Sequence, residues 1–261
     1  LVKNHFSLIG SEGRPAEGPL CTSVWGGMRS ESVIERVKAI KDLGLPIEYI
    51  WMDAGWCGGD TQPSASEFEG DWAEHTGDWR ISPLIHPQGL CDVADAIHEN
   101  GMKYILWFEP ERVRPNTKLW NEHPEYLLFF RGDPEDRRNN NALLDLGNPE
   151  ALSWLIEHVD SIIKQSHIKI YRQDFNFRPL DYWTENDEDG RDGITEMKYI
   201  AGLYDLWDSL LAEFPHLLID NCASGGRRLD LETSRRSVTL WKSDTWQGSV
   251  TEGMTVCAFI L

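Results

Sequence analysis

The chain has 261 residues, 41% of them hydrophobic, and a formal net charge of -18 at pH 7. A surface this acidic repels nucleic acid and anionic membranes, so neither is expected as a partner. No apolar run approaches the roughly 18 residues that a membrane span needs, and the length suits one large α/β core.

Strands and helices alternate along the sequence. Residues 1–19 are rich in Gly and Pro and are predicted to form an irregular arm that leads in from an upstream segment. Short apolar runs predict strands over residues 21–27, 47–56, 102–111, 168–177, 216–226 and 237–246. Apolar spacing and end signals predict helices over residues 30–44, 88–100, 147–165, 195–213 and 229–235, with a short helical stretch at 117–129 and another helix beginning in the last residues.

Two of these helices have clear end signals. Gly44 is expected to stop the first helix, whose apolar face is predicted to include Val37 and Leu43. Asn148 is the expected N-cap of the helix over 147–165, because Pro149 follows it at the first helical position.

The strand–helix order, repeated six times, predicts a parallel sheet with helical crossovers. Every predicted strand ends in polar or special residues. A barrel draws its site from the carboxyl ends of most strands, whereas a doubly wound sheet uses one switch point. We therefore predict a TIM (β/α)8-type barrel over residues 20–261, with about six βα units present and the last two missing at the C-terminal end.

The cysteines and histidines give no sign of a metal site. The five cysteines are odd in number and lack CxxC spacing, so we expect free, mostly buried thiols. The histidines show no HxxxH or HxH pairing, and "GGRR" at 225–228 lacks the spacing of a phosphate-binding loop. We expect neither a metal nor a cofactor. The cysteines are Cys21, Cys57, Cys91, Cys222 and Cys257.

A charged and amide-bearing row ends the predicted strand "IKIYRQDFNF". Arg172, Asp174 and Asn176 occupy alternate positions, and alternate strand residues share one face. Arg and Asp are almost never fully buried unless they are paired. Arg172 is therefore expected to keep Asp174 ionised, and it can also bind a hydroxyl group.

Asp174 and Asp244 end two different predicted strands. Two carboxyl groups facing each other across a barrel mouth can share glycoside hydrolysis, one as nucleophile or base and the other as proton donor. The donor needs a pKa raised by burial or by a second acid, and Trp241 and Trp246 beside Asp244 can supply an apolar wall. For each acid alone, the alternative is a cap or a loop anchor.

Other strand ends carry candidate sugar contacts. Flat aromatic faces beside carboxylates suit a sugar ring, and the 12 Trp are an unusual number. Asp53, with Trp56 behind it, suits the hydroxyl edge of a hexose, the alternative being a cap or a loop salt bridge. Core packing explains Trp107 equally well, and a tight turn explains the glycines after Cys222. Two further acids, which are either substrate contacts or partners of nearby arginines, are Glu109 and Glu111.

Five segments, in this order, resemble the catalytic barrel of glycoside hydrolase family 36, the α-galactosidase (melibiase) family, over nearly the whole chain. They are "ILWFEPERVRPNTKLWNEHPEYLL", "ALLDLGNPEAL", "YRQDFN", "DNCASGG" and "WKSD". The resemblance implies a retaining exo-α-galactosidase with Asp174 as nucleophile and Asp244 as acid/base. It also implies contacts to the galactosyl unit from Asp53, Trp107, Arg172, Asn176, Cys222 and Gly225.

The sequence departs from the family pattern at two positions. Ala54 stands where the family often has a second acid, so one hydroxyl contact is expected to be lost or supplied elsewhere. Arg172 stands where the family often has Lys. Because a guanidinium is a flat fork rather than a point charge, the hydroxyl that it reaches is expected to differ.

The resemblance implies an α-galactoside oligosaccharide or glycoconjugate as partner, and it leaves open whether the full-length protein forms a homo-oligomer. Within the same chemistry, the alternative is an α-N-acetylgalactosaminidase. The small "CASGG" loop can supply the space for an acetamido group at the second carbon of the sugar. A galactosyl-transferring relative needs a covalent intermediate shielded from water. A non-catalytic sugar-binding barrel is the alternative from a different class. No signal peptide is visible, and the compartment stays open.

Overall fold

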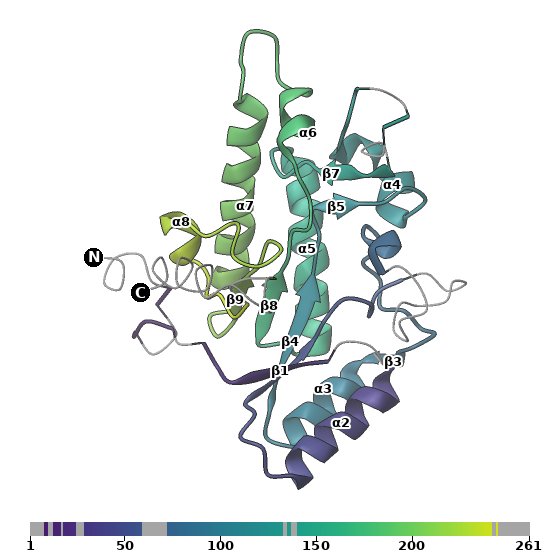
Figure 1. Ribbon diagram of the computed structural model, residues 1–261, viewed down its shortest axis with the longest axis vertical. Helices are drawn as coiled ribbons and strands as arrows, with labels where there is room; N and C mark the ends of the chain where they lie inside the picture. The colour runs from purple at the N-terminus through teal and green to yellow at the C-terminus, as the bar shows by residue number, and fades with distance from the viewer. Residues whose placement is uncertain are drawn as a thin grey trace.

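A five-stranded parallel sheet lies at the centre of the fold (Figure 1). The protein is represented by a computed structural model that describes residues 8–9, 13–16, 18–24, 29–58, 72–132, 135–136, 140–241 and 244. In spatial order the strands are β1 (Cys21–Val24), β2 (Tyr49–Met52), β4 (Lys103–Phe108), β8 (Ile170–Gln173) and β9 (Leu218–Asn221). Spatial order thus follows sequence order, as in a barrel wall, whereas a doubly wound sheet reverses at its switch point.

The sixth strand position is marked by Val238. This residue forms a parallel bridge with Asp220 of β9, and its amide donates to the carbonyl oxygen of Ile219 at 2.8 Å. Its own carbonyl oxygen accepts from the amide of Asn221 at 2.9 Å. The chain therefore continues the barrel order past β9, while part of the predicted strand 237–246 lies outside the described residues.

In the described part of the chain, four long helices connect the parallel strands, as the periodicity predicts. They are α2 (Ser30–Asp42), α3 (Cys91–Glu99), α5 (Pro149–Ser166) and α7 (Ile194–Glu213). The shorter elements are α4 (Lys118–Glu122), α6 (Leu180–Thr184), α8 (Leu231–Ser234), the two 3-10 turns η2 (Trp72–His75) and η3 (Pro124–Tyr126), and the strand β3 (Pro87–Leu90). Within the described part of the chain, no helix is long and apolar enough to cross a membrane.

The helix ends follow local chemistry. The Asn148 side chain accepts a hydrogen bond from the Glu150 amide at 3.0 Å, so the predicted N-cap of α5 is confirmed. The prediction that Leu43 belongs to the apolar face of α2 is wrong, because the helix ends at Asp42 and Leu43 is 73% exposed. Gly44 then turns the chain with a φ of +64°, a conformation that favours glycine.

A small antiparallel sheet follows the carboxyl end of β4. Its strands are β5 (Arg112–Val113), β7 (Ala142–Leu144) and β6 (Leu127–Phe129), in that spatial order. The predicted helical stretch over 117–129 is therefore only partly correct, since α4 and η3 give way to β6. Strands of two or three residues are too short to show a period of two in the sequence.

The inner and outer faces of the parallel sheet pack into separate clusters. The outer face and the helices form one large buried core. On the inner face, Trp51, Ile105 and Ile170 lie side by side in register. Tyr49, two residues before Trp51 on β2, is buried with them. This apolar inner layer forms the floor on which the polar ends of the strands stand.

The N-terminal arm contacts the last described helix. The amide of Leu8 donates to the carbonyl oxygen of Ser234 in α8 at 3.1 Å, and Ile9 bridges Pro15 in antiparallel fashion. Four of the five cysteines lie in the described part of the chain, and all four are free thiols: Cys21, Cys57, Cys91 and Cys222.

Candidate active site

A polar layer covers the inner apolar floor at the carboxyl ends of the strands. Trp107 of β4 is in register with Arg172 of β8, which is in register with Asp220 of β9. Trp107 and Arg172 each lie two residues beyond a member of the floor, and Asp220 lies two residues beyond Leu218, which packs against the floor. The three side chains therefore point to the same inner face. The sheet register thus assembles an aromatic ring, a cation and an anion from three different strands.

Arg172 is fixed on both sides within this layer. Its Nη1 forms an ion pair with Asp220, and its Nη2 donates to the Cys222 sulfur at 3.2 Å. The guanidinium also lies 3.8 Å from the ring centre of Trp51. Burial disfavours the charged form, but the negative charges of Asp220, Asp53 and Asp174 more than offset this, so the pKa of Arg172 lies above its ordinary value.

Four N–H donors surround the Asp174 carboxylate, two on each oxygen. Oδ1 accepts from the amides of Phe175 at 2.7 Å and Ser224 at 3.1 Å. Oδ2 accepts from the Asn176 amide group at 2.9 Å and the Trp107 indole at 3.2 Å. Burial would raise the pKa of Asp174, but the charge of Arg172 and these side-chain donors lower it below the ordinary value. This direction agrees with the expectation that Arg172 favours the ionised form of Asp174.

Asn176 joins Asp174 to two further elements. Its amide nitrogen Nδ2 donates to Asp174, its Oδ1 accepts from the Ser224 hydroxyl at 2.6 Å, and its backbone N–H donates to Glu109 at 2.7 Å. The alternate spacing predicts that Arg172, Asp174 and Asn176 share one face. The structure places Asp174 and Asn176 in contact, but Asn176 lines the cavity described below and the other two residues do not.

Asp53 and Trp107 stand where they can form a wall beside Asp174. Burial raises the pKa of Asp53 to about 6, although the charge of Arg172 opposes this shift. Trp107 is almost wholly buried, and its ring meets Trp72 edge-on at 5.2 Å. Its indole donates to Asp174. Trp107 therefore both packs in the core and contacts the carboxylate.

The position of Trp56 does not fit its predicted role as a sugar contact. The side chain is fully buried, and its indole donates to the carbonyl oxygen of Trp107 at 2.7 Å. Its ring packs edge-on against Phe108 at 5.2 Å. Because protein atoms cover the whole residue, Trp56 supports the backbone of Trp107 from the core and does not present a face to a ligand.

The loop after β9 brings its backbone against Asp174, as the glycine-rich sequence indicates. Ser224 and Gly225 both adopt positive φ, +45° and +84°. This geometry turns the Ser224 amide toward Asp174 and its hydroxyl toward Asn176. Cys222 is buried, and burial raises the pKa of its thiol. Sequence reasoning missed Ser224, and its position between "CA" and "GG" is the only local signal. Direct contacts of Cys222 and Gly225 with a sugar stay predictions.

Asp244 is exposed and contacts a neighbouring tryptophan. Its carboxylate accepts a hydrogen bond from the Trp241 indole at 3.0 Å, and the residue is exposed. The dry surroundings that we expected for a proton donor are not found among the described residues. Positions 242–243 and 245–261, including Trp246, lie outside them.

Two buried glutamates after β4 organise the surroundings of the site. Glu109 accepts from Arg112 at 2.6 Å and from Asn176, and burial raises its pKa to about 7 against the opposing charge of Arg112. Glu111 pairs instead with Arg228, at 2.7 and 3.0 Å. The prediction of nearby arginine partners is thus confirmed for Glu109, whereas the partner of Glu111 comes from 117 residues away.

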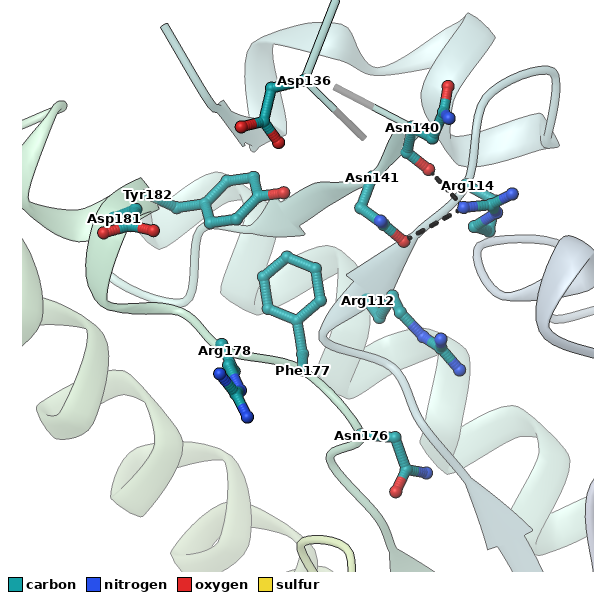
Figure 2. A pocket seen from close by; sticks show the side chains of 10 residues that line it. All are labelled: Arg112, Arg114, Asp136, Asn140, Asn141, Asn176, Phe177, Arg178, Asp181 and Tyr182. Atoms are coloured by element: carbon teal, nitrogen blue, oxygen red, sulfur yellow. Dashed lines mark hydrogen bonds between the residues drawn. The ribbon is translucent and has the colours of Figure 1, made fainter. Parts of the chain in front are cut away.

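A cavity of about 550 Å³ opens beside Asn176. Figure 2 shows its lining, including the neighbouring rings of Phe177 and Tyr182. The centres of these two rings lie 4.7 Å apart. Within the described residues, no group of three or more His, Cys, Asp or Glu side chains is placed to hold a metal ion. The cavity is lined by Arg112, Arg114, Asp136, Asn140, Asn141, Asn176, Phe177, Arg178, Asp181 and Tyr182.

Parallel strands in barrel order, with buried carboxylates at their carboxyl ends, define a protein of the (β/α)8-barrel class. The chain belongs to the melibiase family, whose family model matches residues 9–251. The resemblance to the α-galactosidase (melibiase) family that the sequence motifs indicate is thereby confirmed.

Named relatives agree with this assignment. "Alpha-galactosidase 1" of Pediococcus pentosaceus is 28% identical over 239 residues, which are 91% of this chain and 31% of that protein. "Probable alpha-galactosidase C" of Aspergillus flavus is 30% identical over 254 residues, 94% of this chain and 32% of that protein. The chain therefore spans about a third of the length of these relatives.

Solved structures confirm the barrel fold. The α-galactosidase of Lactobacillus brevis superposes with a TM-score of 0.74 at 26% identity, over 94% of this chain and 32% of that one. The GH36 α-galactosidase AgaA of Geobacillus stearothermophilus has a TM-score of 0.77 at 24% identity, over 94% of this chain and 33% of that one.

Proposed function

We propose that this chain supplies the catalytic barrel of a retaining exo-α-galactosidase that hydrolyses terminal α-galactosides by double displacement. Membership of the melibiase family and the names of the relatives support the activity. The observation that carries the proposal is the state of Asp174. A buried carboxylate held ionised by a neighbouring arginine and four N–H donors is suited to act as a nucleophile.

The proposed reaction has two steps. Asp174 attacks the anomeric carbon while Asp244 protonates the leaving oxygen, and Asp244 then deprotonates the water that releases galactose. Retention of configuration requires carboxyl groups about 5–5.5 Å apart, whereas inversion requires about 6.5–9.5 Å. Asp244 must also lose water contacts when substrate binds, because a proton donor needs a raised pKa at working pH.

The surrounding residues are assigned to galactose binding. Asp53 accepts hydrogen bonds from sugar hydroxyls, Arg172 orders the layer beneath the sugar, and Trp107 forms part of the wall. Asn176 and the loop carrying Cys222 and Gly225 complete the set. We also assign residues 20–261 to the barrel and residues 1–19 to the arm that precedes it.

The substrate proposed for the protein is an oligosaccharide or glycoconjugate that ends in α-galactose. AgaA of Geobacillus stearothermophilus has been solved with stachyose and with raffinose, in variants at 23% and 24% identity to this chain. Both are neutral α-galactosides. The same class is the expected substrate here.

The test uses the protein in its full natural length and two matched substrates, 4-nitrophenyl α-galactoside and 4-nitrophenyl N-acetyl-α-galactosaminide. Hydrolysis of the first in preference to the second is expected, with retained anomeric configuration by NMR. Preference for the second indicates the N-acetylgalactosaminidase alternative, and sugar transfer to added acceptors in place of hydrolysis indicates the transferring alternative.

Asp174→Ala supplies the second arm of the test. This variant should lose nearly all turnover, and azide should restore part of it by occupying the vacated space as a substitute nucleophile. The matched control is Asp205→Ala, which removes an exposed aspartate of α7 that belongs neither to the proposed catalytic pair nor to the cavity lining. If Asp174→Ala hydrolysed the galactoside as fast as the wild type, the enzyme assignment would be wrong and a sugar-binding barrel would replace it.

A further inference from the structure

The Asn176 side chain lies between the proposed nucleophile and two polar residues that hold its amide group from opposite ends. Its Nδ2 donates to the Asp174 carboxylate at 2.9 Å and contacts Oε2 of Glu109 at 3.4 Å. Its Oδ1 accepts from the Ser224 hydroxyl at 2.6 Å. Both polar atoms of this side chain therefore have partners, which follow the carboxyl ends of three different strands, β4, β8 and β9.

Glu109 is well ordered for holding Asn176. The residue is fully buried, its Oε1 accepts from the Asn176 backbone N–H at 2.7 Å, and its Oε2 accepts from Arg112 at 2.6 Å. The Arg112 guanidinium in turn lies over the Trp72 ring, 5.2 Å from its centre. The Glu109 carboxylate cannot turn away from these donors without leaving a buried charge unpaired, which is costly.

Ser224 holds the other end of the amide group, and Arg227 fixes the direction of its hydroxyl. Arg227 donates from Nη2 to the Ser224 oxygen at 2.5 Å and from Nε to the Ala223 carbonyl oxygen at 3.0 Å. A guanidinium can only donate, so the hydroxyl accepts from Arg227 and directs its single O–H at Oδ1 of Asn176. The Ser224 backbone N–H also donates to Asp174, at 3.1 Å.

These donors and acceptors select one orientation of the Asn176 amide group. Carboxylate oxygens only accept when ionised, so the NH2 group has to face Asp174 and Glu109. In the reversed orientation, the carbonyl oxygen would face two buried carboxylates and the NH2 group would face a hydroxyl that already donates toward it. The observed orientation keeps an N–H donor on Oδ2 of Asp174.

We propose that Glu109 and Ser224 are positioning residues for the nucleophile, which together clamp the Asn176 amide group so that Asp174 is held where it can attack. The inference rests on the proposed galactosidase function and concerns the rate of the chemical step. A reacting group has to be held within about 0.5 Å of its productive position. A small displacement therefore costs rate even when the substrate still binds.

The first experiment measures kcat and KM for 4-nitrophenyl α-galactoside in the full-length protein. Glu109→Gln keeps the shape of the side chain but replaces one acceptor oxygen with an NH2 group, which then faces Asn176 or Arg112. We expect kcat to fall by about tenfold in Glu109→Gln, which loses a hydrogen bond to a charged group, and by about fivefold in Ser224→Ala, which loses a neutral one. KM should stay within about twofold, because a group that acts only on the chemical step lowers kcat alone.

The matched control for the serine is Ser237→Ala. This variant removes a buried hydroxyl with a hydrogen bond of 2.6 Å that lies outside the described contacts of Asn176 and Asp174. Both kinetic constants should stay at the wild-type values. A loss of kcat in Ser237→Ala as large as that in Ser224→Ala would assign the effect to general packing and overturn the clamp.

A double-variant cycle tests whether Ser224 acts through Asn176. Ser224→Ala should lower kcat in the wild-type background but change it little in Asn176→Ala, where the hydroxyl has no amide group to hold. Equal losses in the two backgrounds would overturn the clamp. This cycle decides the question by itself if Glu109→Gln does not fold.

The outcomes separate the two proposals. If the wild type cleaves the aryl galactoside but Glu109→Gln and Ser224→Ala keep its kcat, or raise KM alone, the clamp is overturned and the proposed function stands. If the wild type does not cleave the aryl galactoside, the proposed function fails and the clamp fails with it.

Discussion

Arg172 and Asp220 form an ion pair that is buried on the inner face of the sheet, in the layer below Asp174. The pair joins neighbouring strands β8 and β9, and the remaining oxygen of Asp220 accepts from the Leu240 amide at 2.8 Å. A buried pair of this kind is costly to break from one side, because the remaining charge keeps its burial without its partner.

Asp220→Asn should therefore destabilise the protein by about 3–5 kcal/mol, the range for a buried pair that loses one member. The measurement is the free energy of unfolding from urea titration. Asp208→Asn is the matched control, because Asp208 pairs with Arg236 on an exposed surface and should change stability by less than about 1 kcal/mol. Equal changes in the free energy of unfolding would show that the buried pair contributes no more to stability than the exposed pair.

Galactose binding should depend on the charge of Asp53. Burial raises the pKa of this carboxyl to about 6. It is therefore charged above that pH, where it accepts strong hydrogen bonds from sugar hydroxyls, and becomes neutral as the pH falls through 6. The inhibition constant for galactose should rise below pH 6 in the wild type, and in Asp53→Asn it should be higher overall and flat over the same range. The exposed Glu125 offers a control, since Glu125→Gln should leave the wild-type curve in place.

Trp107→Phe tests the indole hydrogen bond to Asp174. The substitution keeps an aromatic ring in the core but removes the donor that lies 3.2 Å from Oδ2. We expect kcat for an aryl galactoside to fall by about tenfold, which corresponds to one hydrogen bond to a charged group. Trp79→Phe is a suitable comparison, because its buried indole nitrogen has no hydrogen-bond partner among the residues that the structure describes, and its ring centre lies 6.2 Å from that of Trp107. Losses of similar size in both variants would assign the effect to packing.

The role of Asp244 can be tested through the leaving group. A proton donor matters most when the departing oxygen is a poor leaving group, and little when that oxygen leaves unaided. Asp244→Ala should therefore slow hydrolysis of phenyl α-galactoside far more than that of 2,4-dinitrophenyl α-galactoside. The two aryl groups are close in size, so binding changes largely cancel. Equal losses on both substrates would exclude Asp244 as the acid.

The fold was predictable because its long elements carry strong periodic signals. Buried strands such as β4 and amphipathic helices such as α5, with Asn148 as its cap, can be recognised from their own residues. The antiparallel sheet was not predictable, since β5 has two residues and takes its stability from pairing with β7 rather than from its own sequence. The same limit applies to α6, which has five residues.

The candidate site was predictable where it lies on one strand. Arg172, Asp174 and Asn176 are close in sequence, so their shared face follows from strand geometry alone. The partners that hold them come from elsewhere: Asp220 and Ser224 are 48 and 50 residues away from the groups that they contact. Such contacts depend on the register between β8 and β9, which local sequence does not encode.

The buried carboxylate of Glu111 has a consequence for exchanging parts of this barrel between relatives. It receives hydrogen bonds from Gln173 of β8, Tyr199 of α7 and Arg228 beyond β9. Gln173 and Tyr199 belong to one βα unit and Arg228 to the next. Together with the unit that carries Glu111, three successive βα units therefore share one anion. A chimera that imports any one unit with a different residue at its contact position leaves this charge incompletely satisfied in the core. Recombination within this half of the barrel is therefore expected to succeed only when the junctions transfer Glu111 and its three partners together.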